Sequence, residues 1–347
     1  MKILIDGRVL KHKYTTGVER YTIEVLKAFD KLNLNYELAL PFSKIRYLQH
    51  IWEHIVLPIN SKKYDILFCP ANISPIFKFK NIKQVIVIHD LSSVYYPLMY
   101  KRSYTLYYNT FTPLMLRISD RIITCSETVK KEISKKYLIP DDKIVAIPNG
   151  ISEVFLSSDK EIKKEKEKYI LCVGTLNPRK NLKRVIFAFK KLLNKIEHKL
   201  YIVGGYFNIY SKDSQLEFLL KTIPKDRIKV FGYLKTDEEL KKLYSLADCF
   251  VFASLYEGSG LPPTEAMACG CPVVVSNIDV LKERCGDAAY YVNPYDVEDI
   301  AEGIYKVTTD FSLKEILIKK GLERVKNFSW EKTAKNIIKV FEDVLLR

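Results

Sequence analysis

Short apolar runs alternate with longer amphipathic stretches along the whole chain of 347 residues. Each run is rich in Val, Ile, Leu, Tyr or Phe and is closed by turn-forming residues. Because strands that alternate with helices favour parallel sheets, the pattern predicts an α/β fold. The predicted strands are, in chain order, KILIDGRV, YELALP, YDILFCP, KQVIVIHD, DRIITCS, KIVAIPNG, KYILCVGTL, HKLYIVGG, RIKVFGYL, DCFVFAS, CPVVVSN and AAYYVNP.

Helical periodicity is clearest in residues 181–196. Apolar side chains there recur every three or four positions, which is the spacing of one helix face. This predicted stripe consists of Leu182, Val185, Ile186, Phe189 and Leu192.

Capping residues locate three further helices. Thr236 and Glu239 have the spacing of a capping box, which predicts a helix that runs to about Ala247. Helices at about 312–327 and 329–346 close the chain with no strand after them, and Ser329 is the expected N-cap of the last one.

A charged stretch at 151–168 separates the strands into two groups, and it lacks a sustained apolar face after Phe155. We therefore predict two Rossmann-like doubly wound domains that face a central cleft, with ligand sites at the carboxyl ends of the strands. The predicted boundaries are an N-terminal domain at 1–160, a C-terminal domain at 161–328, and a helix at 329–347 that returns to the first domain.

Composition indicates a protein that stays in the cytoplasm. Apolar residues make up 48% of the chain, yet no run approaches the roughly 18 apolar residues of a membrane span. The first residues form a strand pattern instead of a secretory signal. The seven cysteines include no CxxC pair, and one glycine separates Cys269 from Cys271, so neither a disulfide framework nor a zinc site is indicated.

The net charge of +15 is unevenly distributed. Residues 1–168 hold 28 Lys and Arg against 18 Asp and Glu, and therefore carry +10 of the total. A solvated lysine-rich surface accounts for this excess, as does affinity for an anionic membrane, an anionic lipid or a nucleic acid.

The strongest chemical motif is the segment 257–267, EGSGLPPTEAM, which follows one predicted strand and precedes a helix. Glycines let backbone amides approach a ligand closely, and proline suits the first turn of a helix. The helix dipole and the free amides then form an anion site of the size of a diphosphate. The residues predicted to supply it are Gly258, Ser259, Gly260 and Leu261.

Two carboxylates flank this loop, Glu257 before it and Glu265 in the predicted first turn of the helix. Carboxylates accept hydrogen bonds from vicinal sugar hydroxyls. The spacing allows one to reach a transferred sugar and the other a ribose. Glu265 by itself also fits an ordinary carboxylate that complements the helix dipole.

The Glu-x7-Glu segment resembles that of the family-4 retaining glycosyltransferases, which have the GT-B fold. Further segments match this family in order along nearly the whole chain: 16–21 (TGVERY), 88–91 (IHDL), 124–127 (TCSE), 147–150 (IPNG), 173–181 (VGTLNPRKN) and 328–331 (FSWE). The resemblance implies an acceptor-side N-terminal domain and a C-terminal domain that binds a nucleotide-sugar.

Arg179 and Lys180 are predicted to stabilise the diphosphate as it leaves. Cations at the start of a helix oppose the helix dipole, so an anionic ligand explains them better than an ordinary basic turn. The chain has no Asp-x-Asp motif, and no divalent metal or other cofactor is predicted, in agreement with the metal-independent chemistry of the family. Many relatives carry Arg where this chain has Thr175, which we expect near the donor.

His89 and Gly17 enter as site residues through the resemblance. His89 ends an apolar strand and should lie at the carboxyl edge of its sheet, where the family implies contact with the transferred sugar. Gly17 matches a glycine loop that approaches the donor phosphates, although Glu19 replaces the second glycine common there. In the second half, Tyr233 and the Gly204–Gly205 pair are weaker candidates for the base and ribose, and they also fit simple turns.

Residues 50–54 (HIWEH) match the H-x-x-E-H metalloprotease pattern. The pattern is short, no third ligand is evident, and relatives of the family carry a similar Trp-Glu helix. The protease hypothesis is therefore much the weaker one.

Residues 94–121 are dense in tyrosine and carry four basic side chains. Such a segment suits a membrane interface, and it equally suits a pair of core-packing helices with a tyrosine-rich face. The family's acceptors are often lipid-linked glycans, so peripheral association with the inner face of the cytoplasmic membrane stays open.

The resemblance implies a retaining glycosyltransferase of polysaccharide or lipopolysaccharide biosynthesis. It would move a hexose, with mannose preferred, from GDP-mannose or a UDP-sugar to a glycan or lipid-linked glycan. A GT-B sugar-nucleotide epimerase would instead consume donor without acceptor. A basic nucleic-acid-binding protein would need a recognisable reading module, and none is visible.

Overall fold

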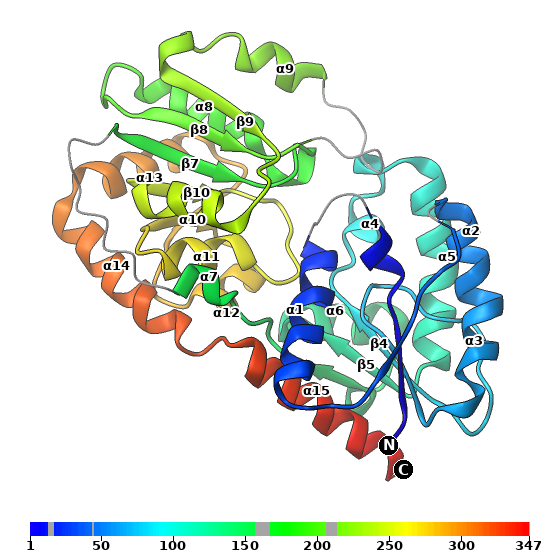
Figure 1. Cartoon of the computed structure of the whole chain (residues 1–347). Coiled ribbons are helices and arrows are strands. Elements are labelled where there is room, and N and C mark those ends of the chain that lie inside the picture. Colours follow the sequence, from blue (N-terminus) through cyan, green and yellow to red (C-terminus); the bar gives the residue numbers. More distant parts are fainter. Residues whose placement is uncertain (13–16, 44, 157–166, 206–213, 347) are drawn as a thin grey trace. The chain divides into compact units, whose positions relative to one another are not determined.

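The computed structural model describes residues 1–12, 17–43, 45–156, 167–205 and 214–346. Contacts group these residues into two compact units (Figure 1). The first unit comprises Met1–Tyr95, Thr105–Gly150 and Phe328–Arg347, and the second comprises Tyr96–Tyr104 and Ile151–Asn327. The predicted linker begins where the second unit begins, and its residues 157–166 lie outside the described part of the chain.

All the predicted strands are confirmed, and they form two parallel six-stranded sheets. The first sheet has the order β2-β1-β3-β4-β5-β6 and the second the order β12-β11-β10-β7-β8-β9. The strands of the first are β1 (Ile3–Asp6), β2 (Glu37–Ala39), β3 (Ile66–Cys69), β4 (Lys83–Ile88), β5 (Arg121–Thr124) and β6 (Ile144–Ala146). Those of the second are β7 (Tyr169–Val173), β8 (Lys199–Val203), β9 (Ile228–Gly232), β10 (Cys249–Phe252), β11 (Val273–Ser276) and β12 (Tyr290–Val292).

Helices cover both faces of the first sheet. Alternate residues of one strand point to opposite faces, so Ile3 and Ile5 pack with α1 and α15, whereas Leu4 packs with the helices of the other face. The helices are α1 (Gly17–Lys31), α2 (Arg46–Ile51), the π-helix η2 (Trp52–Val56), α3 (Leu57–Asn60), α4 (Ser92–Tyr95), α5 (Arg102–Ile118), α6 (Glu127–Tyr137) and α15 (Trp330–Leu345). Short 3-10 turns are η1 (Arg8–Lys11), η3 (Ser61–Lys63), η4 (Pro97–Met99) and η5 (Asp141–Lys143).

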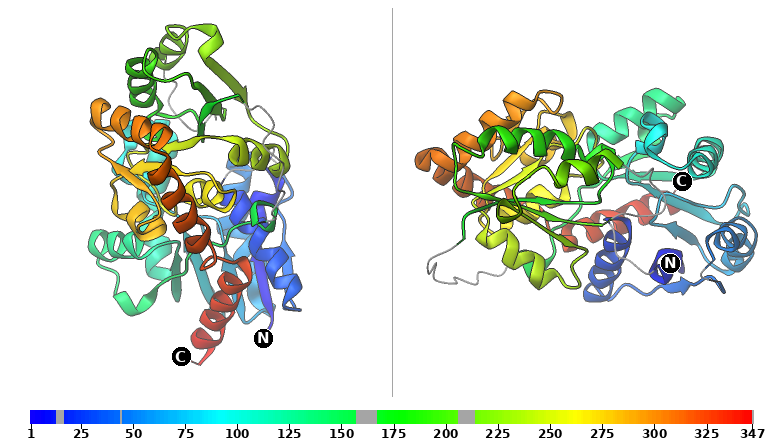
Figure 2. Two further views of the ribbon diagram at one scale, coloured as in Figure 1. Left: turned by 90° about the vertical axis from the view of Figure 1, so that its left-hand side faces the viewer. Right: turned by 90° about the horizontal axis from the view of Figure 1, so that it is seen from above.

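The last helix, α15, packs against α1 on the first sheet (Figure 2). Its strongly amphipathic sequence buries Trp330, Ile337 and Phe341 in the same core as Tyr21. Ser329 is its N-cap and accepts a hydrogen bond from the Lys332 amide, as the sequence predicts.

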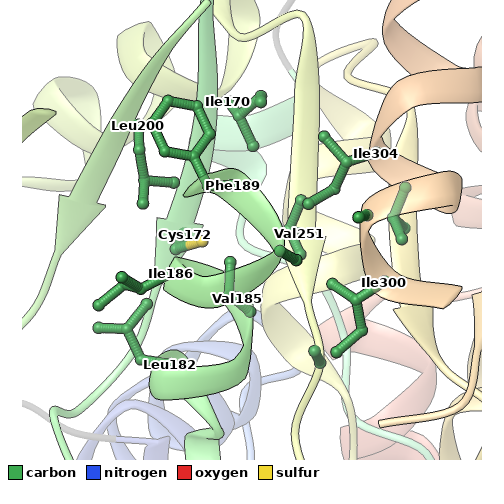
Figure 3. Packing of buried hydrophobic residues seen from close by; sticks show 14 of the residues in the cluster. Ile170, Cys172, Leu182, Val185, Ile186, Phe189, Leu200, Val251, Ile300 and Ile304 are labelled. Atoms are coloured by element: carbon green, nitrogen blue, oxygen red, sulfur yellow. The ribbon is translucent and has the colours of Figure 1, made fainter. Parts of the chain in front are cut away.

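The second sheet is covered on one face by α8 and α13, whose apolar stripes fill the core (Figure 3). All members of the predicted stripe on α8 are buried, but the helix begins at Leu182 and ends at Leu192, four residues before the predicted end. The other helices and turns are α7 (Glu153–Leu156), η6 (Pro178–Lys180), α9 (Ser214–Leu220), η7 (Lys225–Arg227), α10 (Asp237–Leu246), α11 (Leu261–Ala268), α12 (Asp279–Cys285), α13 (Val297–Thr309) and α14 (Phe311–Val325).

Local capping explains where two of these helices start. Thr236 and Glu239 form the predicted capping box of α10, with the Thr236 hydroxyl accepting from the Glu239 amide. Asp310 caps α14 by accepting from the Leu313 amide, so this helix starts one residue earlier than predicted.

Candidate functional site

The strand order of the second unit locates a ligand site. Strands β7 and β10 are neighbours, yet the chain leaves β7 toward β8 and leaves β10 toward β11 in the opposite direction. The loops after β7 and β10 therefore diverge, which opens a crevice at the carboxyl ends of these strands. The loop after β7 carries 174–181, and the loop after β10 carries 253–260. These are the segments in which the sequence predicts the donor site.

A capped 3-10 turn presents Lys180. Asn177 caps η6, and its side-chain oxygen accepts from the Lys180 amide at 3.3 Å. Gly174 has a φ of +152°, and its Cα lies beneath the aliphatic stem of Lys180, so that an added Cβ would lie 3.4 Å from Lys180 Cε. Glycine at 174 therefore allows the Lys180 side chain to pack directly against the backbone.

Arg179 and Lys180 converge on one carboxylate. The Lys180 Nζ atom lies 2.7 Å from Glu257 Oε1, and the Arg179 Nη1 atom lies 3.5 Å from the same oxygen. Arg179 Nη1 also donates to the Tyr256 carbonyl at 2.7 Å, and Lys180 Nζ lies 4.6 Å from the centroid of the Phe252 ring. Two cations thus meet one carboxylate at a largely buried position, where charges interact more strongly than in water.

Beside Lys180 lies a small open hollow. Gly174, Thr175 and Lys180 line it together with the apolar ends of β7, β8 and β10. Thr175, a predicted donor-binding residue, is therefore part of the same surface as Lys180. The hollow therefore combines an apolar floor with one cation, Lys180, in its lining.

The predicted anion loop precedes α11. Gly260 is the N-cap with a φ of +71°, and the helix begins at Leu261 with two prolines in its first turn. Glu265 is the fifth helical residue, so its predicted place in the first turn is wrong, because the helix starts only after the left-handed glycine. Glu265 is buried and accepts from the Tyr244 hydroxyl at 3.3 Å.

Tyr233 follows Gly232, the last residue of β9, at the carboxyl end of this edge strand. Its side chain is 43% exposed and thus accessible to a ligand. Gly204 follows β8, and its amide donates to the Gly232 carbonyl at 2.8 Å. Gly204 and Tyr233 therefore lie in turns at the carboxyl ends of the strands, as Gly174 does. This position agrees with a contact to the base or ribose and equally with a simple turn.

His89 directly follows β4 at the carboxyl edge of the first sheet, as predicted. Its ring is buried, and both nitrogens have neighbours: Nε2 lies 2.7 Å from the Pro70 carbonyl and Nδ1 lies 3.3 Å from Cys125 Sγ. A carbonyl can only accept, so Nε2 carries the proton. Burial lowers the pKa of His89, which keeps the ring neutral at physiological pH.

Gly17 is the first residue of α1 and is exposed, and no heavy atom of the described residues lies within 4 Å of an added Cβ. Of the predicted N-terminal loop at 16–21, residue 16 lies outside the described residues, and 17–21 form the start of α1 instead of a loop. Glu19, which replaces the second family glycine, lies 2.7 Å from His12 Nδ1.

Two family models match the chain in sequence. The model described as Glycosyltransferase Family 4 matches residues 36–154, and the model described as Glycosyl transferases group 1 matches residues 154–324. O-antigen chain mannosyltransferase B of Escherichia coli is 30% identical over 268 residues, which cover 75% of this chain and 70% of that protein. The chain belongs to the family-4 glycosyltransferases.

Other comparisons agree with this assignment. The serotype-specific mannosyltransferase WbdA of Escherichia coli is 32% identical over 284 residues, but the match spans only 34% of that protein. The crystal structure of Anabaena HepE in complex with UDP and glucose superposes with a TM-score of 0.76 at 16% identity and covers 99% of this chain and 100% of that one. The glycosyltransferase thus has the GT-B fold, built from two parallel α/β units.

The Glu and the second His of the H-x-x-E-H pattern contact Arg8 and Tyr107 of the first unit. It spans the end of α2 and the π-helix η2, and its Glu53 is buried beside Arg8, with Arg8 Nε 3.3 Å from Glu53 Oε1. His54 Nε2 lies 2.7 Å from the Tyr107 hydroxyl. Within the described ranges no three His, Cys, Asp or Glu side chains gather as metal ligands do.

Three residues that contact the site residues were not predicted from the sequence. Asn177 could have been found, because an Asn before a Pro commonly caps a turn. Phe252 looks like any strand residue, and Arg8 looks like any surface cation. Their contacts become visible only when distant strands are placed side by side.

Proposed function

We propose that this glycosyltransferase moves a hexose, preferably mannose, from a nucleotide diphosphate-sugar to a glycan acceptor in the synthesis of a bacterial-type polysaccharide or lipopolysaccharide. The observation that carries the proposal is the convergence of Arg179 and Lys180 on Glu257 at the switch point of the second sheet. Relatives that are named mannosyltransferases support mannose.

Each predicted donor residue has a role in this proposal. Arg179 and Lys180 stabilise the negative charge that develops on the diphosphate as the glycosidic bond breaks. The amides of 258–261 bind the same group at the start of α11. Glu257 and Glu265 accept hydrogen bonds from hydroxyl groups of the transferred sugar and the ribose. Thr175 and Tyr233 contact the donor.

The reaction in this proposal retains the anomeric configuration. Gly17 approaches the donor phosphates, and neutral His89 contacts the transferred sugar. The leaving phosphate takes the proton of the acceptor hydroxyl on the face from which it departs. The protein then acts by positioning the reactants and by stabilising leaving-group charge, with Arg179 and Lys180 in the place that a divalent metal takes elsewhere.

A panel of nucleotide sugars tests the donor. We expect GDP-mannose to raise the melting temperature more than UDP-glucose or UDP-N-acetylglucosamine. A ligand at 100 times its Kd stabilises by about 2.7 kcal/mol, which corresponds to roughly 5 °C or more for a unit of this size. Anomer-resolved NMR of the transfer product then reports retention or inversion.

Three results would contradict parts of this proposal. If no nucleotide sugar raises the melting temperature, the second unit does not hold the donor site. A larger shift with a UDP-sugar would replace mannose as the preferred sugar. Conversion of the donor to an epimer without acceptor would favour the epimerase.

We further propose that the acceptor is lipid-linked and that the first unit binds the surface of an anionic membrane. Helices α2, η2 and α3 expose Ile51, Ile55 and Ile59 by 47%, 53% and 51%. Leu106 and Leu114 of α5 are also exposed. We call these five residues the aliphatic surface.

Contacts join the two parts of the aliphatic surface. The Tyr107 ring of α5 lies 4.2 Å from the His50 ring, and Phe111 stacks on His54 at 5.2 Å. Another face of α5 packs into the core through Met115 and Leu116, although residues 94–121 contain one long helix, α5, and not the pair expected. These aromatic contacts join α5 to α2 and η2, and the exposed aliphatic side chains of α5 and of α2–η2–α3 lie on either side of this contact.

Charge favours a lipid partner for this surface. Residues 45–63 and 105–119 contain no acidic side chain apart from the buried Glu53, whereas Lys62, Lys63 and Arg117 are exposed. Aliphatic groups among cations, without anions, complement the headgroup region of an anionic bilayer. No described helix is both long and apolar enough to cross a membrane, so the association would be peripheral.

Co-sedimentation with vesicles tests this surface. We expect the protein to bind vesicles of phosphatidylcholine with phosphatidylglycerol, to bind pure phosphatidylcholine weakly, and to be released by salt. The double variant Ile55→Glu, Leu106→Glu should lose about 10-fold or more in binding, since two aliphatic groups no longer enter the bilayer.

Phe311→Glu is the matched control, because Phe311 is 72% exposed on α14 of the second unit. It should bind the anionic vesicles like the unmodified protein. Equal binding by the double variant would contradict the proposal, as would a dimer in light scattering that the double variant abolishes while neither protein binds vesicles.

A further inference from the structure

A buried ionic cluster fills the switch point of the first sheet. Here β1 and β3 are neighbours, and the chain leaves them in opposite directions. Asp6 ends β1, Arg8 begins η1, and Glu53 comes from the π-helix η2. Their exposed fractions are 0%, 4% and 0%. Charged groups so completely removed from water are rare, and each needs a partner.

Both acids of the cluster contact Arg8. The Arg8 amide donates to Asp6 Oδ1 at 2.9 Å, and its Nε lies 3.3 Å from Glu53 Oε1. Burial, together with the neighbouring Glu53 carboxylate, raises the pKa of Asp6 to about 8. Asp6 therefore favours its protonated form at neutral pH; burial raises the pKa of Glu53 as well, and the Arg8 guanidinium opposes that shift.

Arg8 reaches beyond this pair to a three-residue turn. Its Nη2 donates to the Ala71 carbonyl at 3.3 Å. The turn, residues 70–72, follows β3 and contains Asn72 in the left-handed conformation with a φ of +63°. A non-glycine residue in this conformation persists only where its surroundings hold it.

His89 binds the two other residues of the same turn, Pro70 and Asn72. The His89 amide donates to Asn72 Oδ1 at 2.6 Å, and the ring Nε2 donates to the Pro70 carbonyl at 2.7 Å. Tyr21 completes the enclosure, with its ring edge-on to the His89 ring at 4.7 Å. All three residues of the turn are thus held, Ala71 by Arg8 and its two neighbours by His89.

We propose that Arg8, held by Glu53 and Asp6, is a positioning residue that fixes the 70–72 turn and, through it, the tautomer and orientation of His89. The proposal rests on the proposed function, in which His89 contacts the transferred sugar. A purely stabilising role explains the cluster less well, because buried ion pairs add little stability over apolar residues of similar volume.

The experiment combines NMR of the histidines with steady-state kinetics of the whole chain. The chain has five histidines, so the ring nitrogens of His89 can be assigned in ¹⁵N-histidine-labelled protein with the His89→Gln variant. The variants are Arg8→Met, Arg8→Lys and Glu53→Gln. Arg8→Lys keeps the charge but lacks the fork that reaches both Glu53 and Ala71.

In Arg8→Met we expect His89 to change from the Nε2-protonated tautomer to a mixture. The kcat for transfer should fall by about 10- to 100-fold, the cost of a small misplacement. The donor KM should rise less than kcat falls, because most of the proposed donor groups lie in the second unit. Arg8→Lys should recover part of the tautomer preference and of kcat. Where Arg8→Met does not fold, Arg8→Lys and Glu53→Gln decide by the same two measurements.

Ile133→Ala is the matched control, because Ile133 is fully buried in the apolar cluster beside Trp52 but is not part of this network. It should lower the melting temperature and leave the His89 spectrum and kcat unchanged. Folded Arg8 and Glu53 variants with an unaltered His89 spectrum would overturn the proposal. Full activity of His89→Gln would instead refute the role of His89 in the proposed function, and the spectra would still decide whether Arg8 positions the ring.

Discussion

Replacing Lys180 by alanine is expected to lower kcat for sugar transfer by about 10²- to 10³-fold, the usual cost of one group that stabilises developing charge. The ammonium lies 2.7 Å from Glu257 at the mouth of the hollow beside Gly174. Charge on the diphosphate grows as the bond breaks, so kcat should fall more than the donor KM rises. Initial rates of transfer from GDP-mannose, measured over a range of donor concentrations, check this.

The fold of the Lys180→Ala variant should survive. Glu257 keeps Arg179 as a cationic neighbour at 3.5 Å, so no buried carboxylate is left unpaired. Lys191→Ala is the control, since it removes the same charge from a half-exposed side chain on α8 that pairs with Glu298 at the surface. Wild-type kcat in Lys180→Ala, or an equal loss in both variants, would refute the assigned role.

Replacing Gly204 by alanine is expected to lower the free energy of unfolding by about 3 kcal/mol or more. Gly204 has a φ of +149°, and an added Cβ would lie 1.7 Å from the Gly174 carbonyl oxygen. The ends of β7 and β8 would have to separate. Because Lys180 packs against Gly174, its position would change as well. Urea unfolding at 25 °C measures the loss, and transfer activity should fall with it.

The adjacent glycine gives a matched control. Among the residues that the structure describes, no heavy atom lies within 4 Å of a Cβ added at Gly205, and the φ of Gly205 lies outside the left-handed region. Gly205→Ala should therefore change the free energy of unfolding by no more than about 0.5 kcal/mol. Similar unfolding curves for the two variants would contradict the close approach of β8 to Gly174.

Much of the fold was predictable, for a local reason. Strands of a parallel sheet are buried on both faces, so each appears as a continuous apolar run closed by a turn. Such a run depends on neighbouring residues only, and every predicted strand is present. The capping box of α10 and the Ser329 cap are equally local and were also predicted correctly.

Helix starts were predicted less well where a left-handed residue intervenes. Asn181 has a φ of +58° between η6 and α8, and Gly260 has a φ of +71° before α11. Backbone conformation at these positions depends on the strand ends that they contact. Asn181, for example, donates to the Ala253 carbonyl after β10.

The sequence by itself determined the α/β class, the strands, the presence of Arg179, Lys180 and Glu257 in segments that follow strands, and the presence of Glu265 in the next helix. Only the tertiary structure decided that Lys180 pairs with Glu257, 77 residues away, and that Arg8 pairs with Glu53. The reason is the order of strands within each sheet: β7 lies beside β10, and β1 lies beside β3. That order depends on how whole helices pack between strands, and no local pattern of residues encodes which loops will meet.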